Sequence, residues 1–228
     1  MRCLCSINVI FVFIFHIPMV ISYTEVVESD FNGTILDIET CGSFHKYYDD
    51  SRNYKEISPV IFGYINSESL VVRCAAWRGS LEKLCDEIRV VVPRLDKPLY
   101  AFNSVFERGV LYHSCNLMVN FDGELNLDGK ETMRKARLAL GIGNYDDPFK
   151  DDDAKCTHSW DLECRLGLGD SKSRLSIMHN RSSLLKQRDI LLKRGSRAPD
   201  ELKLFYDVPV ISNDAVASDF VTSTLHTL

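Results

Sequence analysis

The chain has 228 residues, of which 45% are hydrophobic and 26% are charged, with a formal net charge of −5 at pH 7. These fractions exclude a fibrous, low-complexity or wholly disordered chain, and about 205 residues after an apolar start suit one domain with a sizeable core. The acidic balance also excludes a protein that coats nucleic acid by bulk charge, since that requires a basic surface.

Residues 1–22 have the pattern of a secretory leader. Arg2 precedes an apolar stretch of about fifteen residues in which His16 is the single ionisable side chain, and the small polar residue Ser22 ends it. Such a stretch is too short for a stable membrane span. If the leader is genuine, the mature protein starts near Tyr23 and is secreted. If it is an uncleaved anchor or an extension before the true start, we expect an intracellular protein.

The first strand is predicted at residues 34–39, and it carries Asp37 and Glu39. Side chains two residues apart on a strand point to the same face of the sheet. Two like charges held close together repel unless a cation lies between them, and carboxylate oxygens suit Mg²⁺ and Mn²⁺. The pair therefore indicates a metal site, with a solvated pair on an ordinary strand as the alternative.

Five further elements follow in chain order. Strands are predicted at residues 59–65 and 69–76, joined by a hairpin-like turn. Apolar residues at helical spacing predict a helix from Ser80, the expected N-cap, to about residue 92. A short buried strand at residues 98–102 leads directly into a helix at residues 104–115.

The order β-β-β-α-β-α predicts an α/β fold with a mixed sheet covered by helices. We expect residues 34–39 to form the central strand. Its expected neighbours are antiparallel strands near Ile61 and Val71 and a parallel strand near Tyr100.

Charge is distributed unevenly in the second half of the chain. Acids gather at residues 146–153, whereas residues 165–203 hold ten Lys or Arg against four acids. A basic lobe on an acidic protein suits a local contact with a phosphate backbone. A solvated helix face is the alternative.

Six cysteines follow the leader, at positions 41, 74, 85, 115, 156 and 164. An even number permits three disulfides in an oxidising compartment. We interpret most of them as buried thiols, because four lie in or beside predicted strands and helices. Cys156, His158 and Cys164 are bunched together without a second pair of ligands, so a structural zinc is not expected there.

Two motifs at strand ends resemble those of a known family. The segments Leu36-Asp37-Ile38-Glu39-Thr40 and Asn103-Ser104-Val105-Phe106-Glu107 resemble the first two motifs of the DEDD 3′–5′ exonucleases, the DnaQ-like branch of the ribonuclease-H-like superfamily. Glu107 stands where that family usually has Asp, which lengthens the ligand by one methylene.

A third segment, Ile177-Met178-His179-Asn180, resembles the opening of the family's last motif. The family's final Asp is replaced here by Ser183, and the nearest following acid is Asp189. The resemblance covers about residues 33–195.

The resemblance implies a ribonuclease-H-like mixed five-stranded sheet flanked by helices over residues 23–205, with residues 206–228 as a C-terminal tail. It implies two divalent ions, Mg²⁺ or Mn²⁺, and a nucleic-acid substrate with single-stranded ends. The implied metal ligands are Asp37, Glu39, Glu107 and Asp189, with His179 orienting or deprotonating the attacking water. The implied substrate-binding residues are Asn103, Asn180, Arg181, Lys186 and Arg188. The alternatives are an inactive, possibly secreted relative that binds a nucleic acid or protein partner, and an acidic pocket that holds a structural cation.

Overall fold

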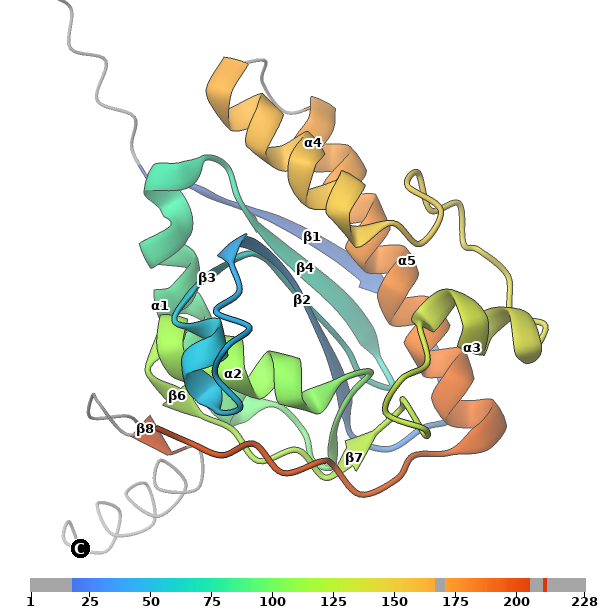
Figure 1. Ribbon diagram of the computed structural model, residues 1–228. Coiled ribbons are helices and arrows are strands. Elements are labelled where there is room, and N and C mark those ends of the chain that lie inside the picture. Colours follow the sequence, from blue (N-terminus) through green and yellow to red (C-terminus); the bar gives the residue numbers. More distant parts are fainter. Residues whose placement is uncertain (1–17, 167–170, 206–210, 213–228) are drawn as a thin grey trace, which may run out of the picture.

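A six-stranded mixed sheet forms the centre of the computed structural model, which describes residues 18–166, 171–205 and 211–212 (Figure 1). The strands are β1 (Val20–Val26), β2 (Thr34–Ser43), β3 (Glu56–Ile65), β4 (Ser69–Ala75), β5 (Leu99–Ala101) and β7 (Gly123–Glu124). Their order is β1-β4-β3-β2-β5-β7. The first four in that order pair antiparallel, and β5 and β7 run parallel to β2. As predicted, β2 lies inside the sheet between an antiparallel strand that contains Ile61 and a parallel strand that contains Tyr100, whereas the strand that contains Val71 pairs with β3 and not with β2.

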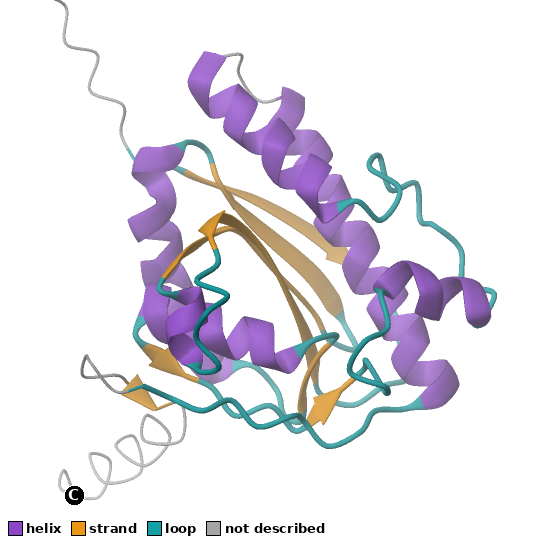
Figure 2. Ribbon diagram, viewed as in Figure 1, coloured by secondary structure: helices purple, strands orange, loops and turns teal. Residues whose placement is uncertain are grey.

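Helices cover both faces of this sheet. They are α1 (Leu81–Val91), α2 (Ser104–Cys115), α3 (Met133–Ala139), α4 (Asp153–Leu166) and α5 (Ser171–Arg194). Helices α1 and α2 pack on one face, and α5 lies with α4 on the other (Figure 2). The described secondary structure also includes short 3₁₀ turns at Ser51–Tyr54, Arg78–Ser80 and Val92–Arg94. A small parallel pair is formed by β6 (Leu117–Met118) and β8 (Ile211–Ser212).

The strands contain runs of apolar residues because the sheet is covered on both sides. Ile35 and Leu36 of β2 are both fully buried, although neighbouring side chains on a strand point to opposite faces. Asp37 and Glu39 continue this strand and are buried as well. The apolar sheet thus holds two carboxylates inside the fold.

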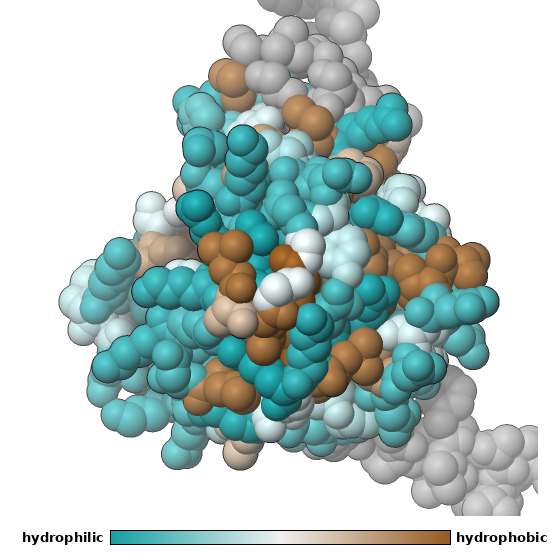
Figure 3. Space-filling model, turned by 90° about the vertical axis from the view of Figure 1, so that its right-hand side faces the viewer, coloured by the Kyte–Doolittle hydropathy of each residue, from teal (hydrophilic) through white to brown (hydrophobic). Residues whose placement is uncertain are grey.

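A tryptophan positions α4 against the sheet. The Trp160 ring is fully buried, and its Nε1–H donates to the carbonyl of Ala75 at the end of β4, at 2.7 Å. On the side that carries α3 and α5, hydrophilic side chains predominate and hydrophobic ones form small separate groups (Figure 3). Trp160 of α4 and Ile177, Leu184 and Ile190 of α5 are buried, whereas Leu175 and Leu192 of α5 are exposed.

The sheet has one strand more than the five expected. Two of its strands, β1 and β7, were not located from the sequence. β1 pairs with β4 at the edge of the sheet, and it begins at Val20, inside the predicted leader. Cleavage near Tyr23 would remove the first three residues of this strand. The apolar end of the leader pattern and the start of an edge strand look alike in sequence. Residues 1–17 of the predicted leader lie outside the described residues.

Ser80 precedes α1 as expected but does not cap it. Its hydroxyl accepts a hydrogen bond from the backbone N–H of Met19 at 2.9 Å, and it makes no side-chain capping bond. The reason is local, because Ser80 ends a 3₁₀ turn that runs directly into α1.

Three further expectations concern the cysteines, the membrane and the tail. All six cysteines of the described residues are free thiols, and those at positions 74, 85, 115 and 156 are buried. No helix in the described part of the chain has the length and apolar character needed to cross a membrane. Of the predicted tail, residues 206–210 and 213–228 lie outside the described residues.

Candidate metal centre

Carboxylates from three elements line one cavity of about 770 Å³. Asp37 and Glu39 extend from β2 just beyond Leu36, the last residue that pairs with β5, and Glu107 extends from the first turn of α2. All three are buried. A fourth acid, Asp153, lines the same cavity from the first residue of α4. The structure therefore brings together three of the four predicted ligands and adds two acids that the sequence did not indicate, since Asp161 of α4 lines the cavity as well and pairs with Arg78.

Burial and mutual repulsion disfavour the charged forms of these groups. Burial raises the pKa of Asp37 well above its usual value, and the charges of Glu39 and Asp153 raise it further. Burial also raises the pKa of Glu107 well above its usual value, and the charge of Asp37 raises it further. The Oε2 atom of Glu107 is buried and has no hydrogen-bond partner. A cation in the cavity would satisfy that oxygen and relieve the repulsion.

Two amides of α5 hold the Asp37 carboxylate. Asn180 donates to Oδ2 at 2.6 Å and Gln187 donates to Oδ1 at 2.5 Å. Gln187 was not predicted, although seven residues are almost two helical turns, which places it on the same face as Asn180. Asn180 was expected to bind substrate, but it is fully buried and orients Asp37 instead.

The close approach of α5 to the sheet depends on Gly63. This residue lies opposite Asp37 on β3. A Cβ atom at this position would lie 2.0 Å from Oδ1 of Asn180 and 2.8 Å from Cδ1 of Leu184. The missing side chain therefore leaves the space through which Asn180 reaches Asp37.

His179 lies among three carboxylates. Its Nδ1 is 2.8 Å from Oδ1 of Asp147, and its Nε2 is 3.2 Å from Oδ1 of Asp153 and 3.4 Å from Oε1 of Glu39. Burial lowers the pKa of His179, but the hydrogen bonds to these three carboxylates outweigh it and raise the pKa to about 12. His179 therefore contacts the carboxylate cluster through both ring nitrogens, and its expected role as a base for water stays a prediction.

A buried ion-pair cluster lies behind His179. Lys186 is fully buried and donates to Oδ2 of Asp147 at 2.7 Å and to Oδ1 of Asp151 at 2.6 Å. The expectation that Lys186 binds phosphate is therefore wrong, because its ammonium group is enclosed and paired. Burial raises the pKa of Asp147, yet the hydrogen bonds from His179 and Lys186 bring it well below its usual range.

The other predicted basic residues are also paired away from the cavity. Arg181 forms an ion pair with Glu25 of β1, with Nη2 2.7 Å from Oε1. Arg188 pairs with Asp189, with Nη2 2.8 Å from Oδ1. Neither arginine lines the cavity, so their expected contacts with substrate phosphates are not supported.

Asp189 is not a ligand in this arrangement. Its carboxylate accepts hydrogen bonds from Tyr145 and Arg188, and it does not line the cavity. The reason is helical geometry, since Asp189 is two residues, or about 200°, beyond Gln187. Ser183, at the position of the resembled family's last Asp, does line the cavity, as does the exposed Asn103 at the start of α2.

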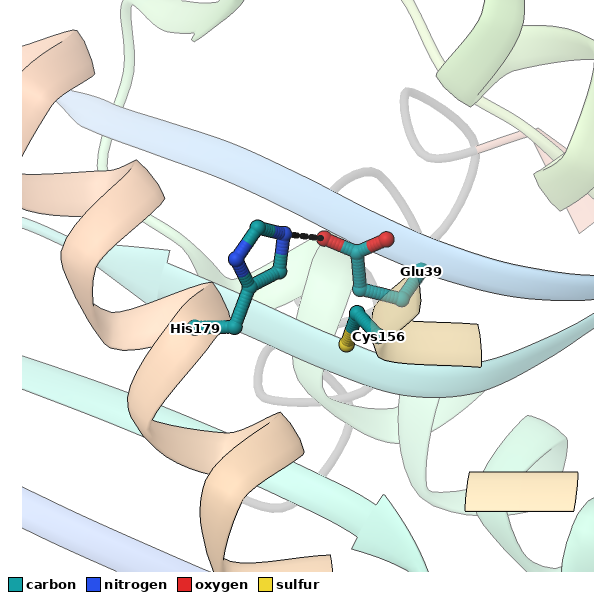
Figure 4. A group of neighbouring side chains, drawn as sticks. All are labelled: Glu39, Cys156 and His179. Carbon is teal, nitrogen blue, oxygen red and sulfur yellow. Dashed lines mark ion pairs between the residues drawn. The ribbon is translucent and has the colours of Figure 1, made fainter. Parts of the chain in front are cut away.

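A buried Glu, Cys and His group adjoins the carboxylates. Glu39 of β2, Cys156 of α4 and His179 of α5 point toward one another (Figure 4), and their ligand atoms all lie within 4.8 Å of one another. The sequence grouped Cys156 with His158 and Cys164, which lie on the same helix. The fold groups it with residues from two other elements.

No protein-family model, curated protein or solved structure matches this chain.

Proposed function

We propose that the chain is a metal-dependent 3′–5′ exonuclease that hydrolyses phosphodiester bonds at single-stranded ends of nucleic acid. The observation that carries the proposal is the convergence of Asp37, Glu39 and Glu107 in one cavity. The sheet order supports it, because the carboxylate strand β2 lies between an antiparallel hairpin and two parallel strands, as expected for a ribonuclease-H-like fold.

The cavity fits hard divalent cations such as Mg²⁺ and Mn²⁺. Its donors are carboxylate oxygens, which these ions prefer, and the unpaired Oε2 of Glu107 is available to one. Asp37, Glu39 and Glu107 would hold the ions, with Asp153 as the fourth acid. Bound divalent ions lower the pKa of a coordinated water and neutralise charge on a phosphate.

The remaining lining groups suit a nucleotide. A volume of about 770 Å³ lies within the range of about 300–1,000 Å³ usual for small-molecule sites. Phe44, Phe102 and Phe106 line the cavity, and aromatic rings stack on bases of any sequence. Arg78 and His158 line it too, and Arg78 is paired with Asp161, which lines the same cavity.

The chain's own residues prepare the site for hydrolysis. Asn180 and Gln187 fix the orientation of the Asp37 carboxylate through both of its oxygens. Buried ligands with fixed orientations need little reorganisation when charge develops on the phosphate.

The test uses 5′-labelled single-stranded DNA and RNA oligonucleotides with Mg²⁺ or Mn²⁺. We expect products shortened progressively from the 3′ end, no cleavage in EDTA, and loss of at least a hundredfold in rate for Asp37→Asn. Asp189→Asn is the matched control, because Asp189 lies outside the cavity, and its rate should be unchanged. If folded protein binds Mn²⁺ but leaves every oligonucleotide intact, the proposal fails. The neutral Ser183 in place of an acid would then explain a protein that binds metal without cleaving nucleic acid.

A further inference from the structure

We infer that Glu39, Cys156, His179 and Asp153 form a binding site for Zn²⁺. The site shares Glu39 and Asp153 with the carboxylate cavity but takes a cation of a different class. It depends on the donor atoms alone and does not require the chain to cleave nucleic acid.

The distances between donors suit a small tetrahedral site. Two ligands at bond lengths of about 2.0–2.1 Å from a tetrahedral Zn²⁺ lie about 3.3 Å apart. The Nε2 atom of His179 is 3.4 Å from Oε1 of Glu39 and 3.2 Å from Oδ1 of Asp153. The sulfur of Cys156 lies within 4.8 Å of the Glu39 and His179 donors. Small side-chain adjustments would therefore close the four groups around one ion.

The donor types select against Mg²⁺. Magnesium takes oxygen ligands almost exclusively, whereas thiolate and imidazole favour Zn²⁺ and neighbouring transition metals. Cys156 and His179 are both fully buried beside Glu39. The sulfur of Cys156 and the imidazole of His179, together with Glu39, therefore form a donor set that suits Zn²⁺ rather than Mg²⁺.

The surroundings of His179 are those of a metal-bound imidazole. Imidazoles that bind a metal usually donate their other ring N–H to a carboxylate, which fixes the tautomer and the ring orientation. Nδ1 of His179 is paired in this way with Asp147, at 2.8 Å. Asp147 is in turn held by the ammonium of Lys186 and by the backbone N–H groups of Phe149 and Asp151. Nε2 is thereby directed at Glu39 and Asp153.

The competing interpretation is that an imidazolium alone fills this place. In it, His179 serves as the cation between the carboxylates, and Cys156 is an ordinary buried thiol. The thiol has only a weak partner to support that role, since Sγ lies 3.9 Å from the carbonyl oxygen of Ser176. The two interpretations differ in whether the sulfur joins a metal.

The experiment replaces Zn²⁺ with Co²⁺, whose absorption spectrum reports a bound thiolate. The full chain is stripped with a chelator and titrated with Co²⁺ alone. We expect one Co²⁺ per chain, a thiolate-to-cobalt charge-transfer band in the near ultraviolet, and displacement of that band by one equivalent of Zn²⁺. A folded wild-type chain with no such band overturns the inference without any variant.

Two matched substitutions assign the sulfur. Cys156→Ser should abolish the charge-transfer band, whereas Cys164→Ser, eight residues later on the same helix, should retain it. Asp147→Asn should weaken Zn²⁺ binding by about 10–100-fold through the imidazole it orients. A band that survives Cys156→Ser, or that is lost with Cys164→Ser, overturns the site. The spectrum reports ligands and the oligonucleotide assay reports cleavage, so either proposal can fail alone.

Discussion

The buried cluster behind the cavity makes a quantitative prediction for Asp147→Asn. The Asp147 side chain has no exposed surface, and its two oxygens accept from His179, Lys186 and two backbone N–H groups. The substitution removes the charge and leaves two buried cations with one carboxylate fewer. Removing one partner of a buried ion pair costs about 3–5 kcal/mol. Lys186 keeps its bond to Asp151 at 2.6 Å, so we expect the lower end, about 3 kcal/mol.

Urea unfolding of the chelated protein, followed by circular dichroism, measures this loss as a lower midpoint at unchanged slope. The matched control is Asp152→Asn. Asp152 pairs with Lys155 at the surface, where both side chains are more than one third exposed, so its loss should cost under about 1 kcal/mol. Asparagine can also keep the bond that Asp152 accepts from the backbone of Lys155. If Asp147→Asn costs no more than Asp152→Asn, the buried cluster does not stabilise the fold as argued.

Two further predictions concern the packing of α5. Gly63→Ala would place Cβ against Asn180 and should destabilise the chain by about 1–3 kcal/mol. The control Gly143→Ala should leave stability unchanged, because no atom lies within 4 Å of a Cβ at position 143. If the two variants have equal midpoints in thermal unfolding, the close contact between Gly63 and Asn180 does not restrict residue 63. The hydrogen bond from Arg181 lowers the pKa of Glu25 in the folded chain. The stabilisation from this ion pair is therefore fully present above the unfolded pKa of Glu25, about 4.3, and is lost as the pH falls through the lower folded pKa. Glu25→Gln should therefore cost under about 1 kcal/mol at pH 7 and less at pH 3, and a cost that is equal at both pH values would refute the ion pair.

The sequence predicted the part of the site that depends on local order. Asp37 and Glu39 share a face because a strand has a period of two. Glu107 joins them because α2 follows the parallel neighbour of β2 after two residues. A strand, its parallel neighbour and the next helix thus bring three carboxylates together without knowledge of distant packing.

The sequence failed where charge or proximity along the chain was used in place of packing. Lys186 was counted as part of a basic lobe, but it is paired with Asp147 and Asp151, which lie in the loop between α3 and α4. Asp189 was chosen because it is the nearest acid after His179, although the helix turns it away from the residues that contact β2. A count of charges does not show which of them are already paired.

Asp153 and Cys156 could not be assigned because α4 reaches the site through tertiary packing. In the run of acids at residues 151–153, nothing distinguishes the one that faces His179. That choice is made by the buried Trp160 ring, bonded to the end of β4, which sets α4 against the sheet.

Asp153 supplies a carboxylate to the cavity in which position 183 supplies none. Ser183 lines the cavity with a neutral hydroxyl, so α5 contributes no carboxylate there. The fourth carboxylate comes from the first turn of α4, and Cys156 lies three residues later on the same helix. Residues three apart on a helix lie side by side, so an α4 placed to bring in Asp153 brings the thiol as well. The element that supplies the fourth acid therefore also supplies the sulfur that makes the site suitable for Zn²⁺.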